Sequence, residues 1–152
     1  MVPPRWLYRA GWALHNLVDR LSGGRVGTVR PRGTRLGVLF LTTVGARSGA
    51  ERRNAVYYLE AGQNVLVVGS NAGAQGNPAW WHNLRAHPEA AVEIDGLSRR
   101  VRARAATDTE AQAAWTRFAA SSAQFEEYRK AVERQIPIVV LEPMEGEDGV
   151  SA

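Results

Sequence analysis

The chain has 152 residues and a formal net charge of +4, from 19 Lys and Arg against 15 Asp and Glu. This length fits one domain with a single hydrophobic core, and no segment approaches the roughly 20 apolar residues of a membrane-spanning helix. The absence of cysteine excludes disulfides and cysteine nucleophiles, and the spacing of the three histidines indicates no metal site.

The N-terminal part, residues 1–34, is predicted to be a basic amphipathic helix followed by a loop. It is rich in arginine and contains a single acid, Asp19. Arginines together with Trp6 and Trp12 suit a bilayer surface, so one expectation is peripheral membrane contact through residues 1–21. The alternative is a helix docked on the rest of the chain. Because no secretory signal is evident, we expect a cytoplasmic protein, at the inner face of the membrane if this helix binds there.

The middle of the chain, residues 35–143, is predicted to be mainly β with a few helices. Apolar or alternating runs predict strands, and capped amphipathic stretches predict helices. No βαβ rhythm repeats, which favours a closed or partly closed antiparallel sheet. The acidic residues 144–152 are predicted to be a disordered tail. The expected strands cover 36–43, 52–60, 64–70, 90–106 as a hairpin, and 136–143. The expected helices begin near 77, at a Thr107-x-x-Glu110 capping box, and near 123, and the last of them ends near 134.

The stretch TTVGARSG contains a glycine-framed turn that carries Arg47 and Ser48, with Arg52 and Arg53 directly after it. The glycines allow a sharp turn with exposed amides, and guanidinium groups bind phosphate or carboxylate through forked hydrogen bonds. An anion site is therefore one interpretation of this turn. A solvated β-turn whose arginines only keep it soluble is the other.

The stretch NPAWWHNLRAHP is predicted to be a short helix with Asn77 as its N-cap and Pro78 at its first position. A helix start offers free amides to an anion or a polarised oxygen. Trp80 and Trp81 point about 100° apart, so only one of them can face the core. His82 is a candidate acid or base, with a surface or structural histidine as the alternative.

Other candidate residues lie on the strands and on the last helix. Tyr57 and Tyr58 are neighbours on a strand, so one faces inward and the other outward. Ser70 ends a strand before a small-residue loop. Phe125 and Tyr128 lie three residues apart on one side of a helix, either as ordinary packing or as an aromatic lid over a pocket. No GxSxG elbow, GxGxxG or P-loop is present.

Taken in order, these stretches resemble a known family. The sequence runs LFLTT-x-G-x-R-S-G, R-x-N-x-x-Y, VVGSN-x-G, NPAWWHNLRAHP, F-x-x-Y and IPIVVLEP. It resembles the deazaflavin (F420)-dependent nitroreductase and F420H2-dependent quinone reductase family from about residue 36 to residue 143. The resemblance implies a split β-barrel of the FMN-binding-like type, and an enzyme that transfers a hydride from reduced coenzyme F420 to a quinone or nitroaromatic acceptor.

The resemblance also implies roles for individual residues. Tyr57 and Ser70 would be catalytic, by hydrogen bonding to the oxyanion that develops on the acceptor. Together with Phe125 and Tyr128 they would line the substrate side. The implied cofactor-binding residues are Arg47, Ser48, Arg52, Arg53, Asn54, Tyr57, Val68, Gly69, Ser70, Asn71, Ala79, Trp80, Trp81, His82 and Asn83.

The sequence departs from the family pattern at two places, and other functions stay open. Ala46 replaces the first base of the turn, for which Arg53 could compensate. Ser122 and Phe125 stand where a nitro-reducing relative has tyrosines, which weakens a nitroaromatic substrate. The alternatives are an FMN-dependent oxidoreductase, a non-catalytic F420-binding protein and a basic nucleic-acid-binding barrel. Because the arginines at 100–104 lack interleaved aromatics, we expect no nucleic acid partner. Split barrels commonly pair, so a homodimer is also expected.

Overall fold

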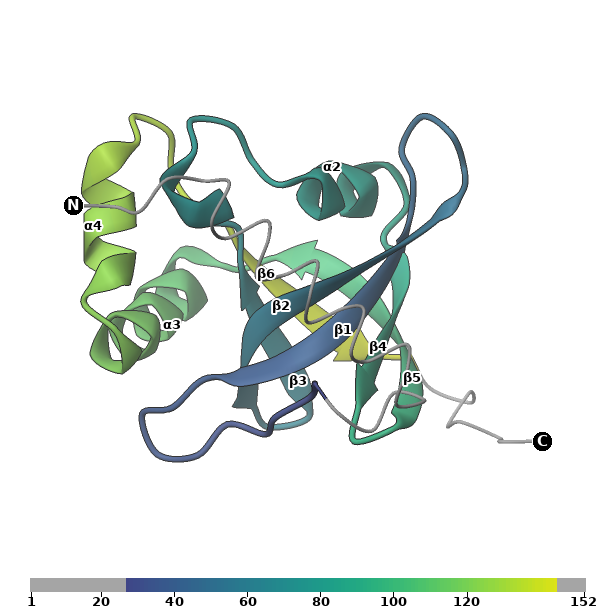
Figure 1. Cartoon of the computed structure of the whole chain (residues 1–152), viewed down its shortest axis with the longest axis horizontal. Helices are drawn as coiled ribbons and strands as arrows, with labels where there is room; N and C mark the ends of the chain where they lie inside the picture. Colours follow the sequence, from purple (N-terminus) through teal and green to yellow (C-terminus); the bar gives the residue numbers. More distant parts are fainter. Residues whose placement is uncertain (1–26, 145–152) are drawn as a thin grey trace.

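A computed structural model describes residues 27–144, in which six antiparallel strands form a closed barrel (Figure 1). Their order around the barrel is β1-β2-β3-β6-β5-β4, and β4 pairs with β1 to close it. This confirms the predicted mainly-β barrel. The strands are β1 (Gly37–Val44), β2 (Glu51–Ala61), β3 (Asn64–Val68), β4 (Glu89–Ile94), β5 (Leu97–Ala105) and β6 (Ile138–Pro143).

Three α-helices and one 3-10 turn connect the strands. The turn η1 (Asn71–Gly73) follows β3, and the helix α2 (Ala79–Ala86) precedes β4. The helices α3 (Asp108–Ser121) and α4 (Gln124–Ala131) lie in sequence between β5 and β6. Figure 1 shows α2 across one end of the barrel, whereas α3 and α4 lie together at its side.

The first of two hydrophobic cores fills the barrel. Alternation along the strands turns Leu39, Leu41 and Tyr58 inward, and each is 0 % exposed. Trp80 and Leu84 of α2 belong to the same cluster, so this helix closes one end of the barrel. The prediction that Tyr58 or Tyr57 faces inward while its neighbour faces outward is confirmed, since Tyr57 is 45 % exposed.

The second core lies outside the barrel, beneath α3 and α4. Leu66 of β3 and Val140 of β6 contribute their outward-facing side chains, and Phe118 of α3 packs against them at 0 % exposure. Both faces of β3 and β6 are therefore buried. This explains why these two segments are continuous apolar runs in the sequence.

The structure moves two predicted helix ends. The N-cap of α2 is Pro78, and the side-chain oxygen of Asn77 instead accepts a hydrogen bond from Arg134 at 2.6 Å. α4 ends at Ala131, whereas the sequence predicts helix as far as residue 134. The side chain of Gln75 occupies the end of α4: it donates to the Ala131 carbonyl at 3.1 Å and accepts from the Glu133 amide at 3.4 Å. Tertiary contacts therefore replaced the expected local ones.

The remaining predictions concern the two ends of the chain. The predicted helix of residues 1–21 and the predicted acidic tail lie largely or wholly outside the described residues. Val29 pairs with Val38 at the edge of β1, and Arg30 donates to Asp95 at 2.7 Å, so the loop before β1 is attached to the barrel. Within residues 27–144, no helix is long and apolar enough to cross a membrane.

Candidate functional site

The glycine-framed turn between β1 and β2 is compact and internally bonded. The Gly45 amide donates to the Ala50 carbonyl at 2.7 Å, and the Ala50 amide donates to the Ser48 hydroxyl at 3.1 Å. A Cβ atom at Gly45 would lie 2.6 Å from that hydroxyl, and Gly49 has a φ of +69°. The backbone at position 49 therefore favours glycine, and a side chain at position 45 would displace the Ser48 hydroxyl from the turn. The Ser48 hydroxyl, a predicted cofactor contact, already stabilises the turn.

Asn83 of α2 holds this turn in place. Its side-chain oxygen accepts from the Ala46 amide at 2.9 Å, and its side-chain nitrogen donates to the Thr43 hydroxyl at 3.0 Å. Asn83 is 7 % exposed, so a polar group that is costly to bury has both of its ends hydrogen-bonded. The side chain of this predicted cofactor residue connects α2 to the turn.

Two of the arginines near the turn are available for an anion. Arg47 and Arg52 are exposed, and neither makes a hydrogen bond or ion pair to another residue of the 27–144 range. Asn54 is also exposed, and alternation along β2 places it on the same face as Arg52. A basic, polar surface therefore adjoins the turn at the α2 end of the barrel.

Arg53 lies on the opposite face of β2 and is already paired. Its guanidinium is 3.9 Å from the centroid of the Phe40 ring and donates to Glu93 at 2.7 Å. A cation–π contact and a salt bridge together hold this side chain against the outer wall of the barrel. The structure therefore disfavours the idea that Arg53 compensates for Ala46.

The aromatic residues of α2 separate as the helix geometry predicts. Trp80 is 7 % exposed and packs in the barrel core, whereas Trp81 is only partly buried. His82 is exposed and lies edge-on to Trp81 at 5.0 Å, and Arg85 lies 4.9 Å from the Trp81 ring. The structure gives His82 no carboxylate partner within residues 27–144, and so no support as an acid or base.

The loop between β3 and α2 is conformationally unusual. Asn71, Ala72 and Gly73 have φ values of 48°, 52° and 77°. Left-handed conformations of non-glycine residues cost of order 1–3 kcal/mol each and persist only where the surroundings enforce them. Ser70 begins the loop, and its hydroxyl has no partner inside the described range. β3 ends at Val68, two residues earlier than predicted, and the predicted cofactor residues Gly69, Ser70 and Asn71 follow it at the start of the loop.

The aromatic side chains beside this loop form a connected row. The Tyr57 and Phe125 ring centroids are 6.4 Å apart, and the Phe125 and Tyr128 centroids are 6.0 Å apart, both edge-on. Phe125 and Tyr128 are each only 5 % exposed and belong to the core beneath α3 and α4. Tyr57 is therefore the exposed member of the row, and the structure favours packing for the other two.

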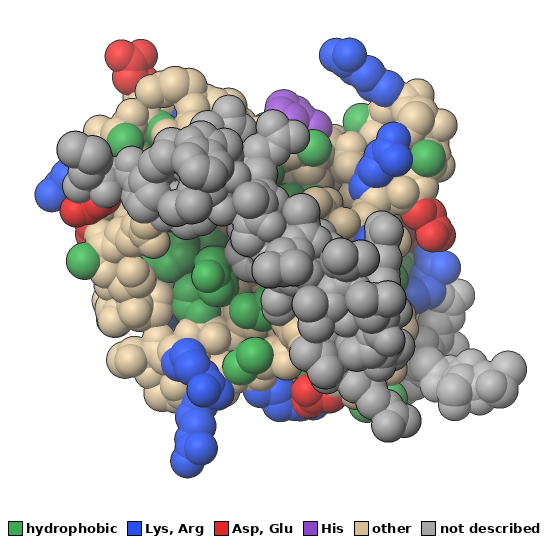
Figure 2. All heavy atoms as spheres, in the orientation of Figure 1, with side chains coloured by type: hydrophobic (Ala, Val, Ile, Leu, Met, Phe, Trp, Pro, Cys, Tyr) green, Lys and Arg blue, Asp and Glu red, His purple; other side chains and the backbone are tan. Residues whose placement is uncertain are grey.

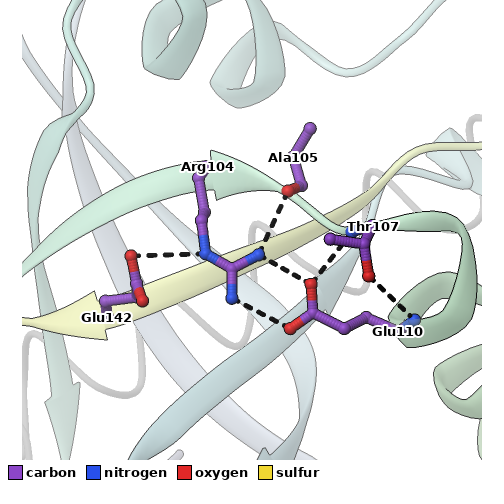
Figure 3. Close-up of polar contacts among 5 residues, drawn as sticks. All are labelled: Arg104, Ala105, Thr107, Glu110 and Glu142. Atoms are coloured by element: carbon purple, nitrogen blue, oxygen red, sulfur yellow. Dashed lines mark hydrogen bonds and ion pairs between the residues drawn. The ribbon is translucent and has the colours of Figure 1, made fainter.

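Three arginines of β5, Arg100, Arg102 and Arg104, are paired with carboxylates. Arg100 and Arg102 lie 3.0 and 3.6 Å from Glu89. Arg104 makes a two-bond fork to Glu110, at 2.7 and 2.9 Å, and also contacts Glu142 at 3.3 Å (Figure 3). Carboxylates therefore offset the charge of these three arginines, and the absence of a nucleic acid partner stays a prediction.

Arg134 is a residue of this site that sequence reasoning missed. Its guanidinium contacts both ends and the middle of the loop between β3 and α2, through Ser70, Ala74 and Asn77. These partners precede it by 57 to 64 positions. No local pattern in the sequence could have shown the contact.

A closed antiparallel barrel with helices at one end and one side defines a split-barrel protein of the FMN-binding-like class. The heme storage protein HutZ of Vibrio cholerae shares this fold, with a TM-score of 0.53 at 14 % identity over 72 % of this chain and 82 % of that one. Residues 13–143 match the family described as F420H(2)-dependent quinone reductase, and the chain belongs to that family.

Individual relatives agree with this assignment. The F420H(2)-dependent quinone reductase Rv1261c of Mycobacterium tuberculosis is 29 % identical over 90 % of this chain and 95 % of its own length. The putative F420H(2)-dependent quinone reductase Rv3178 of the same species is 32 % identical over 69 % and 88 %. A solved F420-H2 dependent reductase (FDR-A) superposes with a TM-score of 0.63 at 25 % identity, over 69 % of this chain and 93 % of that one.

The predicted class of enzyme is thereby confirmed. The protein is an F420H2-dependent oxidoreductase, and reduced F420 is its hydride donor. The FMN alternative finds no support in these relatives. The roles of single residues rest on the resemblance and on the geometry described above, and they stay predictions.

Proposed function

We propose that the protein reduces a quinone-type acceptor at the α2 end of the barrel. Bound F420, in its reduced form, supplies the hydride. The observation that carries the location is a pair of guanidinium groups, Arg47 and Arg52, that have no partner within residues 27–144. They lie on and beside a turn that Asn83 connects to α2. The chain's own part is to bind an anionic cofactor, to orient two flat rings and to exclude water between them.

The phosphate and acidic tail of the cofactor suit the turn. Arg47 and Arg52 present forked donors that match phosphate and carboxylate oxygens. The glycine-framed backbone of residues 45–49 lets an anion approach closely, and Asn54 adds a neutral hydrogen-bonding group beside it. The residues present therefore fit the anionic end of F420, even with Ala46 in place of a base.

The Arg47→Ala and Arg52→Ala variants test this assignment by fluorescence titration with oxidised F420. We expect each variant to weaken binding about tenfold to a hundredfold, because each removes a charge-assisted hydrogen bond worth about 1.5–3 kcal/mol. Raising the salt concentration should reduce the difference in F420 affinity between the wild type and each variant, because salt screens charge interactions. Arg99→Ala is the matched control, since Arg99 is also exposed and has no partner within residues 27–144. Wild-type affinity in both variants would refute the placement.

We place the quinone acceptor between Tyr57 and the loop that joins β3 to α2. Figure 2 shows hydrophobic side chains gathered on this face, over the part of the barrel where β2 and β3 lie in Figure 1, with the cations at its margin. An apolar quinone ring suits such a surface, and the Ser70 hydroxyl could donate to its oxygen. A well-placed donor of this kind contributes about 10²–10³ in rate. Unchanged turnover of reduced F420 with a short-chain naphthoquinone by the Ser70→Ala variant would exclude this role.

We also propose that the N-terminal segment brings the enzyme to the inner face of the membrane, where a lipophilic quinone is found. The support is in the sequence: Arg5, Arg9, Trp6 and Trp12 lie on one predicted amphipathic helix. A cytoplasmic location and a homodimer, the other two expectations, stay predictions. Light scattering after size exclusion would measure the oligomeric state.

A further inference from the structure

The guanidinium of Arg134 connects three points of the loop that runs from Ser70 to Asn77. Its Nη2 donates to the Ser70 carbonyl at 3.0 Å and to the Ala74 carbonyl at 3.1 Å. Its Nε donates to the same Ala74 carbonyl at 3.1 Å, and its Nη1 donates to the side-chain oxygen of Asn77 at 2.6 Å. One side chain therefore holds the start, middle and end of the loop at fixed separations.

The partners of Arg134 within residues 27–144 are all neutral oxygens. Arg134 is part-buried, and cations withdrawn from water are usually paired with a carboxylate, because removing a charge from water is costly. Burial lowers the pKa of Arg134 from its ordinary value, which reflects this cost. No carboxylate of the described range offsets it. Arg134 therefore does not act through an ion pair within the described range. All of its hydrogen bonds go to the loop, so its effect is on the conformation of the loop.

The loop needs such a constraint. Asn71, Ala72 and Gly73 follow one another in the left-handed region. The hydrogen bonds within the loop run from the Gly73 amide to the Ser70 carbonyl and from the Ala74 amide to the Asn71 carbonyl, both at 3.0 Å, and from the Asn71 side chain to the Gly76 carbonyl at 2.8 Å. The ring of Tyr128 packs directly on the loop, so that a Cβ atom at Gly73 would lie 3.0 Å from it. The polar counterpart of this packing comes from Arg134, which contacts three points of the loop, and from Gln75, which contacts Ala131 and Glu133.

We propose that Arg134 is a positioning residue of the enzyme, which locks the Ser70–Asn77 loop so that the Ser70 hydroxyl and the first turn of α2 face the bound rings. The inference rests on the proposed function for its catalytic consequence. It does not require Arg134 to touch the cofactor or the acceptor. The contacts depend on the planar guanidinium of arginine, which donates to three separated oxygens at once. The ammonium group of lysine is a single point charge and cannot span these three oxygens in the same way.

The variants Arg134→Lys and Arg134→Ala test the proposal through two measurements. Hydrogen exchange of the Gly73 and Ala74 amides reports the loop directly and needs no cofactor. Turnover of reduced F420 with a short-chain naphthoquinone reports the catalytic consequence. We expect both amides to exchange at least tenfold faster in both variants, kcat to fall at least tenfold, and added methylguanidinium to restore part of kcat in Arg134→Ala.

Arg117→Ala is the matched control, because Arg117 also donates to a backbone carbonyl, that of Glu60 at 2.8 Å, but lies away from the loop. Loop exchange and kcat within twofold of wild type in folded Arg134 variants would overturn the proposal. If amides across the whole barrel lost protection from hydrogen exchange equally, the proposal would also be overturned, because Arg134 would then contribute only to global stability.

Two further results distinguish the remaining outcomes. If neither Arg134 variant folds, Asn77→Ala removes the Nη1 contact alone, and it should accelerate loop exchange and lower kcat in the same direction. Unchanged loop exchange and kcat in Asn77→Ala would contradict the proposal that Arg134 orders the loop. If the wild-type protein does not turn over reduced F420 at all, the proposed function fails, while the exchange measurement still decides whether Arg134 orders the loop.

Discussion

At the scale of single residues, Tyr58 is the clearest anomaly in the barrel core. It is 0 % exposed, and its hydroxyl has no hydrogen-bond partner among the described residues. The ring occupies the space beside Gly37, where a Cβ atom would lie 2.3 Å from it. Burial, with the nearby Glu60 carboxylate as a smaller cause, raises the pKa of Tyr58 to about 12. The barrel therefore retains an aromatic ring at the expense of an unsatisfied hydroxyl.

We predict that Tyr58→Phe stabilises the protein by about 1 kcal/mol at pH 7, because it removes a buried donor that costs about 1–3 kcal/mol when unpaired. The pH dependence should differ as well. The folded state holds the Tyr58 proton more tightly than the unfolded state, so wild-type stability falls as the pH rises from about 10 towards 12. Tyr58→Phe should lack this fall. Urea unfolding at pH 7 and pH 11 measures both effects, and a destabilised variant would reveal a hydrogen-bond partner of the hydroxyl.

At the scale of elements, the start of α3 combines a capping box with an ion pair. The Glu110 amide donates to the Thr107 hydroxyl at 3.2 Å, and the Thr107 amide donates to the Glu110 carboxylate at 2.9 Å. The same carboxylate accepts the fork from Arg104 of β5 (Figure 3). The capping box is confirmed as predicted, and the salt bridge adds a connection between the helix and the barrel.

The pH dependence of this cap is a test of its contribution. The Arg104 guanidinium, followed by the Thr107 amide, lowers the pKa of Glu110 from 4.5 to about 2. A lowered pKa in the folded state stabilises the fold above pH 4.5, and that contribution is lost as the pH falls towards 2. We therefore expect Glu110→Gln to be less stable than wild type at pH 7 and to approach it near pH 2. Urea unfolding at both pH values measures this, with the exposed Glu127→Gln as control; an unchanging difference would contradict it.

At the scale of the whole molecule, closure of the barrel brings the site together at one end. The turn between β1 and β2, the loop after β3 and the helix α2 come from three separate connections. The pairing of β4 with β1 and of β3 with β6 places these connections beside one another. At the opposite end, Arg30 and Asp95 attach the loop that leads in from the N-terminal segment (Figure 1).

The N-terminal segment is predicted to bind the protein to anionic membranes. We expect the full-length protein to float with vesicles that contain anionic lipid, and a chain that starts at Arg25 to stay in solution. This truncation keeps Val29 and Arg30, which contact the barrel. Neutral vesicles are the control, because binding through arginines depends on anionic headgroups and weakens with salt. Equal flotation of the two chains would exclude a membrane role for the N-terminal segment.

The sequence by itself determined the elements whose causes are local. Alternation along the strands, the capping box at Thr107 and the glycine-framed turn all depend on neighbours within a few positions, and the order of motifs indicated the family. The tertiary structure alone decided which polar groups pair across the barrel. Arg53 with Glu93, Asn83 with Thr43, and Arg134 with Ser70 are 40, 40 and 64 residues apart. Their contacts exist only after the strand register and barrel closure are set, so no local pattern encodes them.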